Sequence, residues 1–417
     1  MNEAIVFLEP KGTILEVIRS AKKRGYKVIA LSSDETLLGQ APEPYRTAVT
    51  LIDTVIEVSG WQDEKEIFAT CAEIHAQTPI VGFYAGLDPC ALILAKLRAK
   101  YGLPTHAPSS IETVLNKFQL RKKLFGLGLS KIQNFTGTEV DQWSDFKIAG
   151  AAYFKPVHGF FSAYVRRCEN MRDLQSAQAE WNKEDSNDPT YVRNYVRLSN
   201  EYHLEEAFDG ELLSVEALVS NGKFQVLGLL SRILYSKNPI IEMGSCFPYP
   251  HPQREKIITL VERAHQALGL TDGPTHTEVI VNENGEVEII DLNPRFVGAD
   301  VLQSINYAYG IKAQEILLDY AIGENPIIDF KGNHFSCLQY FFPPEVSSLQ
   351  SVAFPEGTEV KFHSQFIANG SKLSTVNRQI DYLGCYLTVM PSFSQALNRS
   401  RELRSQVKIN GDQNGVF

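Results

Sequence analysis

The stretch His276-Thr-Glu-Val-Ile-Val-Asn-Glu-Asn-Gly-Glu-Val-Glu-Ile-Ile-Asp-Leu-Asn-Pro-Arg295 is the most informative part of the sequence. It contains Asn284-Gly285, a dipeptide typical of two-residue β-hairpin turns, between two apolar runs. A turn of that kind places Glu278 directly opposite Asp291 and His276 opposite Asn293. The sequence therefore predicts a hairpin that brings two carboxylates, an amide and an imidazole together.

The two carboxylates are candidate metal ligands. Carboxylates about 5 Å apart across a strand pair repel one another unless a cation lies between them. Solvated acids on an edge hairpin are the alternative, but the predicted register also pairs Ile280 with Ile289 on this face, so the face is not simply turned to water. We therefore favour a metal site made of Glu278, Asp291 and Asn293. Such hard oxygen ligands suit Mg²⁺ carrying a nucleotide's phosphates, with Mn²⁺ as an alternative ion.

Arg295 and His276 are the catalytic candidates at the end of this hairpin. Arg295 lies two residues beyond Asn293, after a proline. Its guanidinium could bind phosphate or carboxylate oxygens next to the metal. His276 could contact substrate or phosphate; a buried structural histidine is the alternative.

Composition excludes several classes of protein. The chain has 417 residues, which corresponds to roughly three units of about 150 residues. Apolar residues make up 44% and charged residues 21%, values typical of globular proteins rather than disordered ones. With 40 basic and 49 acidic residues the net charge is −9, so we expect neither nucleic acid nor a membrane as partner. The six cysteines are scattered without a CxxC pair, which favours reduced thiols and a cytoplasmic location.

The first hundred residues alternate short apolar runs with helical patterns, beginning with a predicted strand at Ala4 to Leu8 and a predicted helix at Thr13 to Arg24. This β-α-β alternation predicts a parallel sheet. The turn after the first strand has only one glycine, so a nicotinamide-binding fingerprint is poorly supported. Further along, Ser220-Asn221-Gly222-Lys223 predicts an antiparallel hairpin.

The hairpin residues resemble the ATP-grasp superfamily, most closely its L-amino acid ligase, or carboxylate-amine ligase, branch. Glu278 followed by Asp291-Leu292-Asn293-Pro294-Arg295-Phe296-Val297-Gly298 is similar to the family's E…(E/D)-x-N-P-R-x-x-G signature. In that signature the acids and the asparagine hold magnesium, and the arginine contacts the transferred phosphate. The resemblance covers nearly the whole chain.

The resemblance implies a mixed α/β and α+β fold. We expect a Rossmann-like N-terminal lobe over residues 1–110, an ATP-grasp core of two α+β subdomains over 111–335, and a small C-terminal α+β lobe over 336–417.

The resemblance also implies phosphate-binding residues. Lys117 looks like the lysine of the family's D-K-x-x-x-R helix, although Asn116 replaces the aspartate. Lys155 resembles the strand lysine that binds the α and β phosphates. The segment 158–165 is similar to the loop that covers the phosphates, with Gly159 and Ser162 as contacts. Tyr164 stands where the family usually has glycine, a residue that lets backbone amides approach phosphate closely.

The remaining expected site residues belong to two places, the adenine hinge and the amino-acid pocket. The segment 204–211 looks like the adenine hinge. In relatives the backbone at the positions of Glu206 and Phe208 reads the adenine edge, an acid such as Glu205 assists, and the acid matching Glu211 takes the ribose hydroxyls. For the amino-acid pocket, the resemblance implies these residues: Glu242, Gly244, Arg295 and Gly298.

The resemblance implies an ADP-forming ligase that joins a carboxylate to an amine through an acyl phosphate, with ATP and Mg²⁺ as cofactors. The expected substrates are small molecules, amino acids in particular, and a homodimer is compatible with the sequence. Two alternatives stay open. One is activation of bicarbonate in the manner of a biotin carboxylase. The other is an ATP-binding regulator without catalysis, which the departures Asn116 and Tyr164 would explain.

Overall fold

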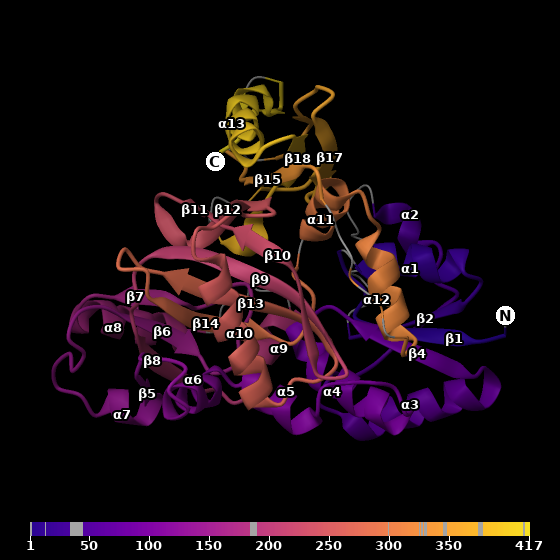
Figure 1. Cartoon of the computed structure of the whole chain (residues 1–417), viewed down its shortest axis with the longest axis horizontal. Coiled ribbons are helices and arrows are strands. Elements are labelled where there is room, and N and C mark those ends of the chain that lie inside the picture. Colours follow the sequence, from indigo (N-terminus) through magenta and orange to yellow (C-terminus); the bar gives the residue numbers. More distant parts are fainter. Residues whose placement is uncertain are drawn as a thin grey trace.

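The computed structural model describes the chain except for residues 1, 13, 34–44, 184–189, 299, 325, 327, 329–331, 345–347, 374–377 and 412. Its elements form a mixed α/β architecture of several sheets, as the sequence predicts (Figure 1). In Figure 1 the N-terminal sheet lies at the right, a small antiparallel sheet at the lower left, a central sheet between them, and the C-terminal elements at the top.

The N-terminal sheet is parallel, with strand order β3-β2-β1-β4. Its strands are β1 (Ala4–Leu8), β2 (Lys27–Ser32), β3 (Thr54–Glu57) and β4 (Ile80–Ala85). Its helices are α1 (Ile14–Lys23), α2 (Arg46–Val49), α3 (Glu64–Gln77) and α4 (Asp88–Lys100). All five residues of β1 are buried, because helices cover both faces of a parallel sheet. The predicted β-α-β alternation is confirmed here.

A small antiparallel sheet follows, with strand order β5-β8-β6-β7. Its strands are β5 (Asn134–Thr136), β6 (Ala152–Pro156), β7 (Arg166–Cys168) and β8 (Tyr202–Glu206). Before and beside it lie the helices α5 (Pro108–Leu115), α6 (Lys117–Gly126), α7 (Gly137–Asp141), α8 (Met171–Trp181) and α9 (Thr190–Val196). Asn116 begins α6, since its side-chain oxygen accepts a hydrogen bond from the Gln119 amide at 2.9 Å. Asparagine is as good a helix cap as the aspartate it replaces.

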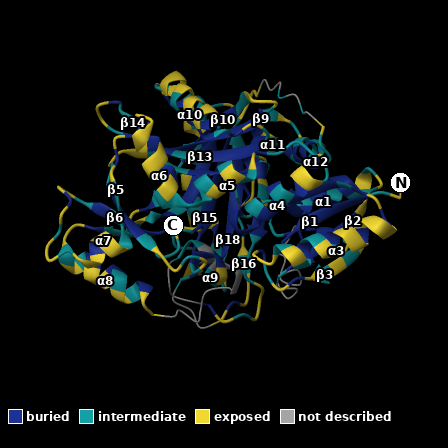
Figure 2. Ribbon diagram, turned by 90° about the horizontal axis from the view of Figure 1, so that it is seen from below, coloured by how far each residue is buried: buried dark blue, intermediate teal, exposed yellow. Residues whose placement is uncertain are grey.

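The central antiparallel sheet has the order β10-β9-β13-β14. Its strands are β9 (Glu211–Ser220), β10 (Lys223–Ser231), β13 (Gly273–Val281) and β14 (Val287–Asn293), with α10 (Arg254–Leu268) packed on one side. Ser220 pairs with Lys223 around Asn221-Gly222, which confirms the hairpin predicted there. Figure 2 shows β9, β10 and β13 buried, while the outer faces of α3 and α10 are exposed.

The β13–β14 hairpin has the predicted pairing at the site but not at the turn. Glu278 pairs with Asp291 and His276 with Asn293, as expected. The predicted pairing of Ile280 with Ile289 is wrong, because Ile280 pairs with Glu288. The turn holds three residues rather than two, since Asn282 pairs with Glu286. Ile290 is an extra, bulged residue in β14, and it restores the register beyond that point.

A five-stranded sheet has the order β11-β12-β15-β18-β17. Its strands are β11 (Ile233–Tyr235), β12 (Asn238–Phe247), β15 (Phe335–Phe341), β17 (Val360–Gln365) and β18 (Gly384–Met390). The other elements of this region are α11 (Val301–Tyr309), α12 (Ala313–Ala321), α13 (Phe393–Leu403), β16 (Val352–Ala353), β19 (Lys408–Ile409) and β20 (Gln413–Asn414), and the 3₁₀ turns Gln379–Asp381 and Arg404–Gln406. Because β12 and β15 are neighbours, this sheet runs across the expected boundary at residue 335.

Helix α12 ties the N-terminal sheet to the rest of the chain. It packs on α1, and Arg24 binds Glu315 and Asp319 at 2.7 and 2.6 Å. Arg98 is buried in α4 and donates hydrogen bonds to the carbonyl oxygens of Tyr320 and Ala321. These contacts hold α12 against the helices and strand β4 of the N-terminal sheet. Among the helices that the structure describes, none is both long and apolar enough to cross a membrane.

Candidate nucleotide and ligase site

A cavity of about 550 Å³ lies where the sheets meet. Most of the site residues expected from the sequence line it: Lys117, Lys155, Gly159, Ser162, Glu205, Glu206, Phe208, Glu242, His276, Glu278, Asp291, Asn293, Arg295 and Gly298. Two expected residues, Glu211 and Gly244, do not. Residues separated by nearly two hundred positions in the sequence therefore share one enclosed space.

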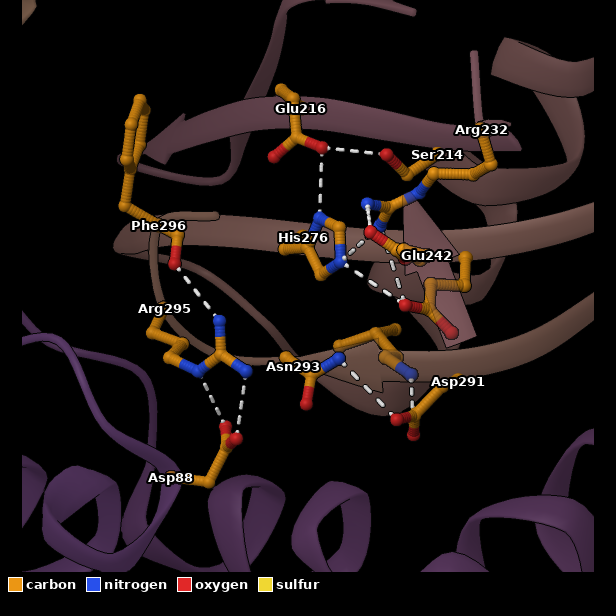
Figure 3. Close-up of polar contacts among 12 residues, drawn as sticks. Asp88, Ser214, Glu216, Arg232, Glu242, His276, Asp291, Asn293, Arg295 and Phe296 are labelled. Atoms are coloured by element: carbon orange, nitrogen blue, oxygen red, sulfur yellow. Dashed lines mark hydrogen bonds and ion pairs between the residues drawn. The ribbon is translucent and has the colours of Figure 1, made fainter. Parts of the chain in front are cut away.

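Two rows of polar side chains cross the central sheet at the cavity. One row runs from Ser214 through Glu278 to Asp291, and strand pairing aligns these three residues. The second row runs from Glu216 through His276 to Asn293. The rows are two residues apart along each strand, so both lie on the same face of the sheet, as Figure 3 shows.

The proposed metal ligands are paired with cationic side chains. Asp291 forms a short ion pair with Lys117, and Glu278 lies 3.3 Å from Arg232. These side-chain cations offset the repulsion between the Glu278 and Asp291 carboxylates. A metal ion is therefore not required to hold the two carboxylates together. Over the described ranges, no three His, Cys, Asp or Glu side chains cluster as a metal site. Two facing carboxylates and the amide of Asn293 still fit Mg²⁺, since it keeps several water or phosphate ligands of its own.

Lys117 is held at the first position of α6, next to these acids. Burial would lower the pKa of its ammonium group, but the Asp291 carboxylate outweighs that effect and raises the pKa. Lys117 is therefore a fixed positive charge inside the cavity.

His276 is buried between two carboxylates. Its Nδ1 lies 2.8 Å from Glu216 Oε1, and its Nε2 lies 3.4 Å from Glu278 Oε1. Burial alone would lower the pKa of His276, but the Glu216 carboxylate has the larger effect and raises the pKa to about 9. If the ring is protonated, it donates to both carboxylates, and the 3.0 Å distance between Arg232 Nη2 and His276 Nε2 is then a contact between two cations. If the ring is neutral, Nε2 accepts a hydrogen bond from Arg232. Either way the ring is fully engaged with protein groups.

Arg295 follows β14 and reaches the N-terminus of α4. Its Nε and Nη2 donate to the two carboxylate oxygens of Asp88 at 2.8 and 2.7 Å (Figure 3). A third bond joins Nη1 to the carbonyl oxygen of Phe296. The two-point bond to Asp88, called the fork below, fixes the guanidinium plane at the cavity wall. It leaves other N–H groups of Arg295 for a ligand.

Lys155 and Arg121 share a buried carboxylate. Lys155 Nζ lies 2.7 Å and Arg121 Nη2 3.1 Å from Glu205 Oε1. Burial favours protonation of Glu205, but the two cations hold its pKa well below the usual range. Glu205 therefore orients Lys155 toward the cavity, a role that differs from the adenine contact expected for it.

The loop expected to cover phosphates contains three non-glycine residues in the left-handed region. Phe161, Ser162 and Tyr164 have φ values of 55°, 52° and 59°. Such conformations cost about 1–2 kcal/mol each for residues with a Cβ. Tyr164 thus keeps the backbone conformation that glycine adopts easily. Its ring packs edge-on against Trp181 and lies 5.2 Å from the Arg197 guanidinium, contacts that offset the strain.

The adenine hinge lies beside β8. The Glu206 backbone N–H already donates to the Gln133 carbonyl, whereas the Phe208 N–H has no backbone partner among the described residues. Phe208 is therefore the better donor for an adenine edge. Glu211 does not line the cavity; it accepts a hydrogen bond from the Tyr249 hydroxyl and lies 3.5 Å from His251, and its ribose contact stays a prediction.

The expected amino-acid pocket contains Glu242 but not Gly244. Glu242 forms an ion pair with Arg232, which also contacts Glu278. Gly244 instead allows β12 and β15 to approach, because a Cβ there would lie 2.3 Å from the Leu338 carbonyl oxygen. Gly298 lines the cavity, and a Cβ there would lie 3.9 Å from Arg295 Nη1, an ordinary van der Waals contact.

Asp88, Glu216 and Arg232 belong to the site although no sequence motif assigns them a role. Glu216 is a lone acid between apolar neighbours of its strand, and Arg232 is a lone cation in the mostly apolar run 229–234. An isolated charge in such a context is the available signal, because burying it requires a partner. Asp88 occurs in the segment that resembles the N-terminal lobe, but nothing local indicates that it binds Arg295.

Asp300 is a further buried acid at the cavity wall. It accepts a hydrogen bond from Tyr45 and lies 3.3 Å from Cys385 Sγ. Burial raises its pKa to about 6. An acid whose pKa rises on folding stabilises the native state fully below its unfolded pKa, and this contribution is lost as the pH rises through the folded value.

We expect the Asp300→Asn variant to lack this pH dependence. Relative to that variant, the wild type should lose about 2 kcal/mol of unfolding free energy between pH 4.5 and 7.5, as a shift of about two pKa units implies. Urea unfolding of both proteins at the two pH values measures the difference. A wild-type minus variant difference that does not change with pH would contradict a buried, titrating Asp300.

Comparison with known proteins agrees with the site. Residues 151–303 match the model of the ATP-grasp domain. The matched segment contains the β13–β14 hairpin, so this part of the chain is similar to an ATP-grasp domain where the signature occurs.

Proteins named as ligases are among those similar to the chain. The chain is 23% identical to alanine–anticapsin ligase from Bacillus amyloliquefaciens over 54% of its length, and it spans about half the length of that curated relative. The structure of an L-amino acid ligase from Bacillus licheniformis superposes with a TM-score of 0.79 at 20% identity, covering 99% of both chains. The biotin carboxylase domain of a Hydrogenobacter thermophilus 2-oxoglutarate carboxylase, solved with MgADP and bicarbonate, gives a TM-score of 0.71 at 16% identity over 98% of this chain and 91% of that one. At these identities the structural matches establish the fold alone.

Proposed function

We propose that the protein is an ATP-dependent ligase that joins the carboxylate of one small molecule, an amino acid in particular, to the amine of another and releases ADP and phosphate. The observation that carries the proposal is the convergence of Lys117, Lys155 and Arg295 with the oxygen ligands of the hairpin in one cavity. Phosphoryl transfer needs such fixed charges around the phosphates more than it needs a covalent nucleophile. The named ligase relatives support the same reaction class.

In this proposal the adenine lies near Phe208, and Lys155 and Lys117 bind and orient the phosphates. A Mg²⁺ ion held by Glu278, Asp291 and Asn293 would neutralise phosphate charge. A carboxylate oxygen of the substrate attacks the γ-phosphorus and displaces ADP, which forms an acyl phosphate. The amine of the second substrate then attacks the acyl carbon, loses a proton, and displaces phosphate.

Arg295 would stabilise both stages. Its fork to Asp88 fixes the guanidinium beside Asn293, where negative charge develops on the phosphoryl group and on the tetrahedral adduct. A preorganised charge of this kind is typically worth roughly 10²–10³ in rate. His276 is engaged with Glu216 and Glu278, so we propose that it positions Glu278 rather than accepting a proton.

We expect ADP release that depends on a pair of amino acids. A screen of paired amino acids with ATP and Mg²⁺, followed by mass spectrometry of the product, measures it. Turnover with bicarbonate alone would favour the biotin-carboxylase-like alternative, to which the fold similarity gives some support. Tight ATP binding without hydrolysis across the whole screen would favour the regulatory alternative. AMP release would exclude the acyl phosphate route.

A further inference from the structure

One end of the cavity is lined by aromatic rings that the nucleotide and metal residues do not use. Tyr340 belongs to β15, and Phe366 and Tyr382 flank β17 and β18. The rings of Tyr340 and Tyr382 stack at 4.6 Å, and the Phe366 ring lies 6.2 Å from that of Tyr340. We call this region, formed by Tyr340, Phe366 and Tyr382, the aromatic end.

One buried hydroxyl group of the cavity wall lacks a partner. The Ser245 hydroxyl makes no hydrogen bond to a described residue, and Ser245 is only 1% exposed. The Tyr340 hydroxyl is also buried, but it contacts the backbone of Asp300. Buried polar groups in native proteins are nearly always paired, and an unpaired one destabilises the fold. A ligand with a polar group would satisfy the Ser245 hydroxyl.

The aromatic end adjoins the reaction centre. The Tyr382 hydroxyl donates to the Glu242 carbonyl, and the Glu242 carboxylate binds Arg232, which contacts Glu278. A ligand among the rings would therefore lie beside Glu242, which the Arg232 side chain links to the proposed metal ligand Glu278. Two acids, Glu242 and Asp300, line this end. The end thus combines ring surface with carboxyl groups, one of which, Glu242, is already paired with Arg232.

We infer that the aromatic end binds the side chain of an aromatic amino acid whose ammonium group faces Glu242. Ring-to-ring contacts add directional attraction to the burial of apolar area, which an aliphatic side chain of similar size lacks. A phenol or indole group could also bond the unpartnered Ser245 hydroxyl. The inference rests on the proposed function for the reaction that follows binding, but binding itself can be measured separately.

Calorimetric titration of the full chain with L-tyrosine, L-leucine, L-alanine and L-glutamate, in the presence of Mg²⁺ and a non-hydrolysable ATP analogue, tests the inference. We expect L-tyrosine to bind at least about tenfold more tightly than each of the others. Phe366→Ala should remove most of this preference, and Phe366→Leu, which keeps apolar bulk at this half-buried position, should remove the part that depends on the ring. Phe362→Ala is the matched control, because Phe362 packs against Tyr45 without lining the cavity.

The outcomes separate this inference from the proposed function. Tighter binding of leucine, alanine or glutamate than of tyrosine overturns the inference, even if ligation is observed. Tyrosine binding that Phe366→Leu and Phe362→Ala reduce equally also overturns it. Preferential tyrosine binding without ADP release in any amino acid pair supports the aromatic end and counts against the ligase.

Discussion

Replacing Glu278 by Gln and Asp291 by Asn together is expected to lower kcat/KM for ATP-dependent turnover by about 10³-fold or more. The substitutions keep the side-chain shapes but remove the negative charge of both carboxylates proposed to bind Mg²⁺. They also leave Lys117 without its acidic partner, whereas Arg232 keeps its ion pair with Glu242. Steady-state ADP release at several Mg²⁺ concentrations measures the effect.

A matched control lies on the same hairpin. Glu286→Gln removes an acid that is half exposed and pairs with Lys131 outside the cavity, and it should leave turnover unchanged. Thermal unfolding of each variant separates a loss of chemistry from a loss of folding. Turnover by the folded double variant within tenfold of the wild type would contradict the assignment of Glu278 and Asp291.

Arg295→Ala is expected to reduce kcat by roughly 10²–10³ with a smaller change in KM for ATP, because we place its charge where negative charge develops during the reaction. Arg295→Lys should recover only part of this loss. Lysine keeps the charge but cannot form the two-point bond to Asp88. Stopped assays of ADP formation at saturating substrates provide the comparison.

Asp88→Asn tests whether the fork matters, and we expect a fall in kcat of about tenfold, smaller than for loss of the arginine itself. Arg24→Lys serves as the control, since Arg24 forms a two-acid ion pair between α1 and α12 away from the cavity. Equal kcat values for wild type and Arg295→Ala would exclude Arg295 from the chemistry.

The site hairpin could be predicted from local sequence only because two deviations cancel. The side chain of Asn282 accepts a hydrogen bond from the Glu286 amide, which favours a three-residue loop closed by Gly285 at φ 71°. The bulge at Ile290 then shifts β14 by one residue. Alternation of apolar and polar residues reports neither feature. The pairing of Glu278 with Asp291 was therefore right, while that of Ile280 with Ile289 was wrong.

The partners of the site residues could not be predicted from the sequence. Asp88 and Arg295 are 207 positions apart, and Arg232 and Glu278 are 46 apart. Such pairs depend on how separate sheets pack, which no periodicity encodes. For the same reason the sequence could not show that Glu205 pairs with Lys155 and Arg121, or that Glu211 pairs with Tyr249. Motif resemblance located the residues, and only the fold showed what each one contacts.

The acyl phosphate is the central claim, and oxygen transfer tests it most directly. The protein would be supplied with ATP, Mg²⁺, an amine and an amino acid labelled with ¹⁸O in its carboxylate, and the products analysed by mass spectrometry. We predict one ¹⁸O atom in the released inorganic phosphate, because the attacking carboxylate oxygen leaves with the phosphoryl group. Product formation with ¹⁸O in AMP, or with unlabelled phosphate, would contradict the mechanism.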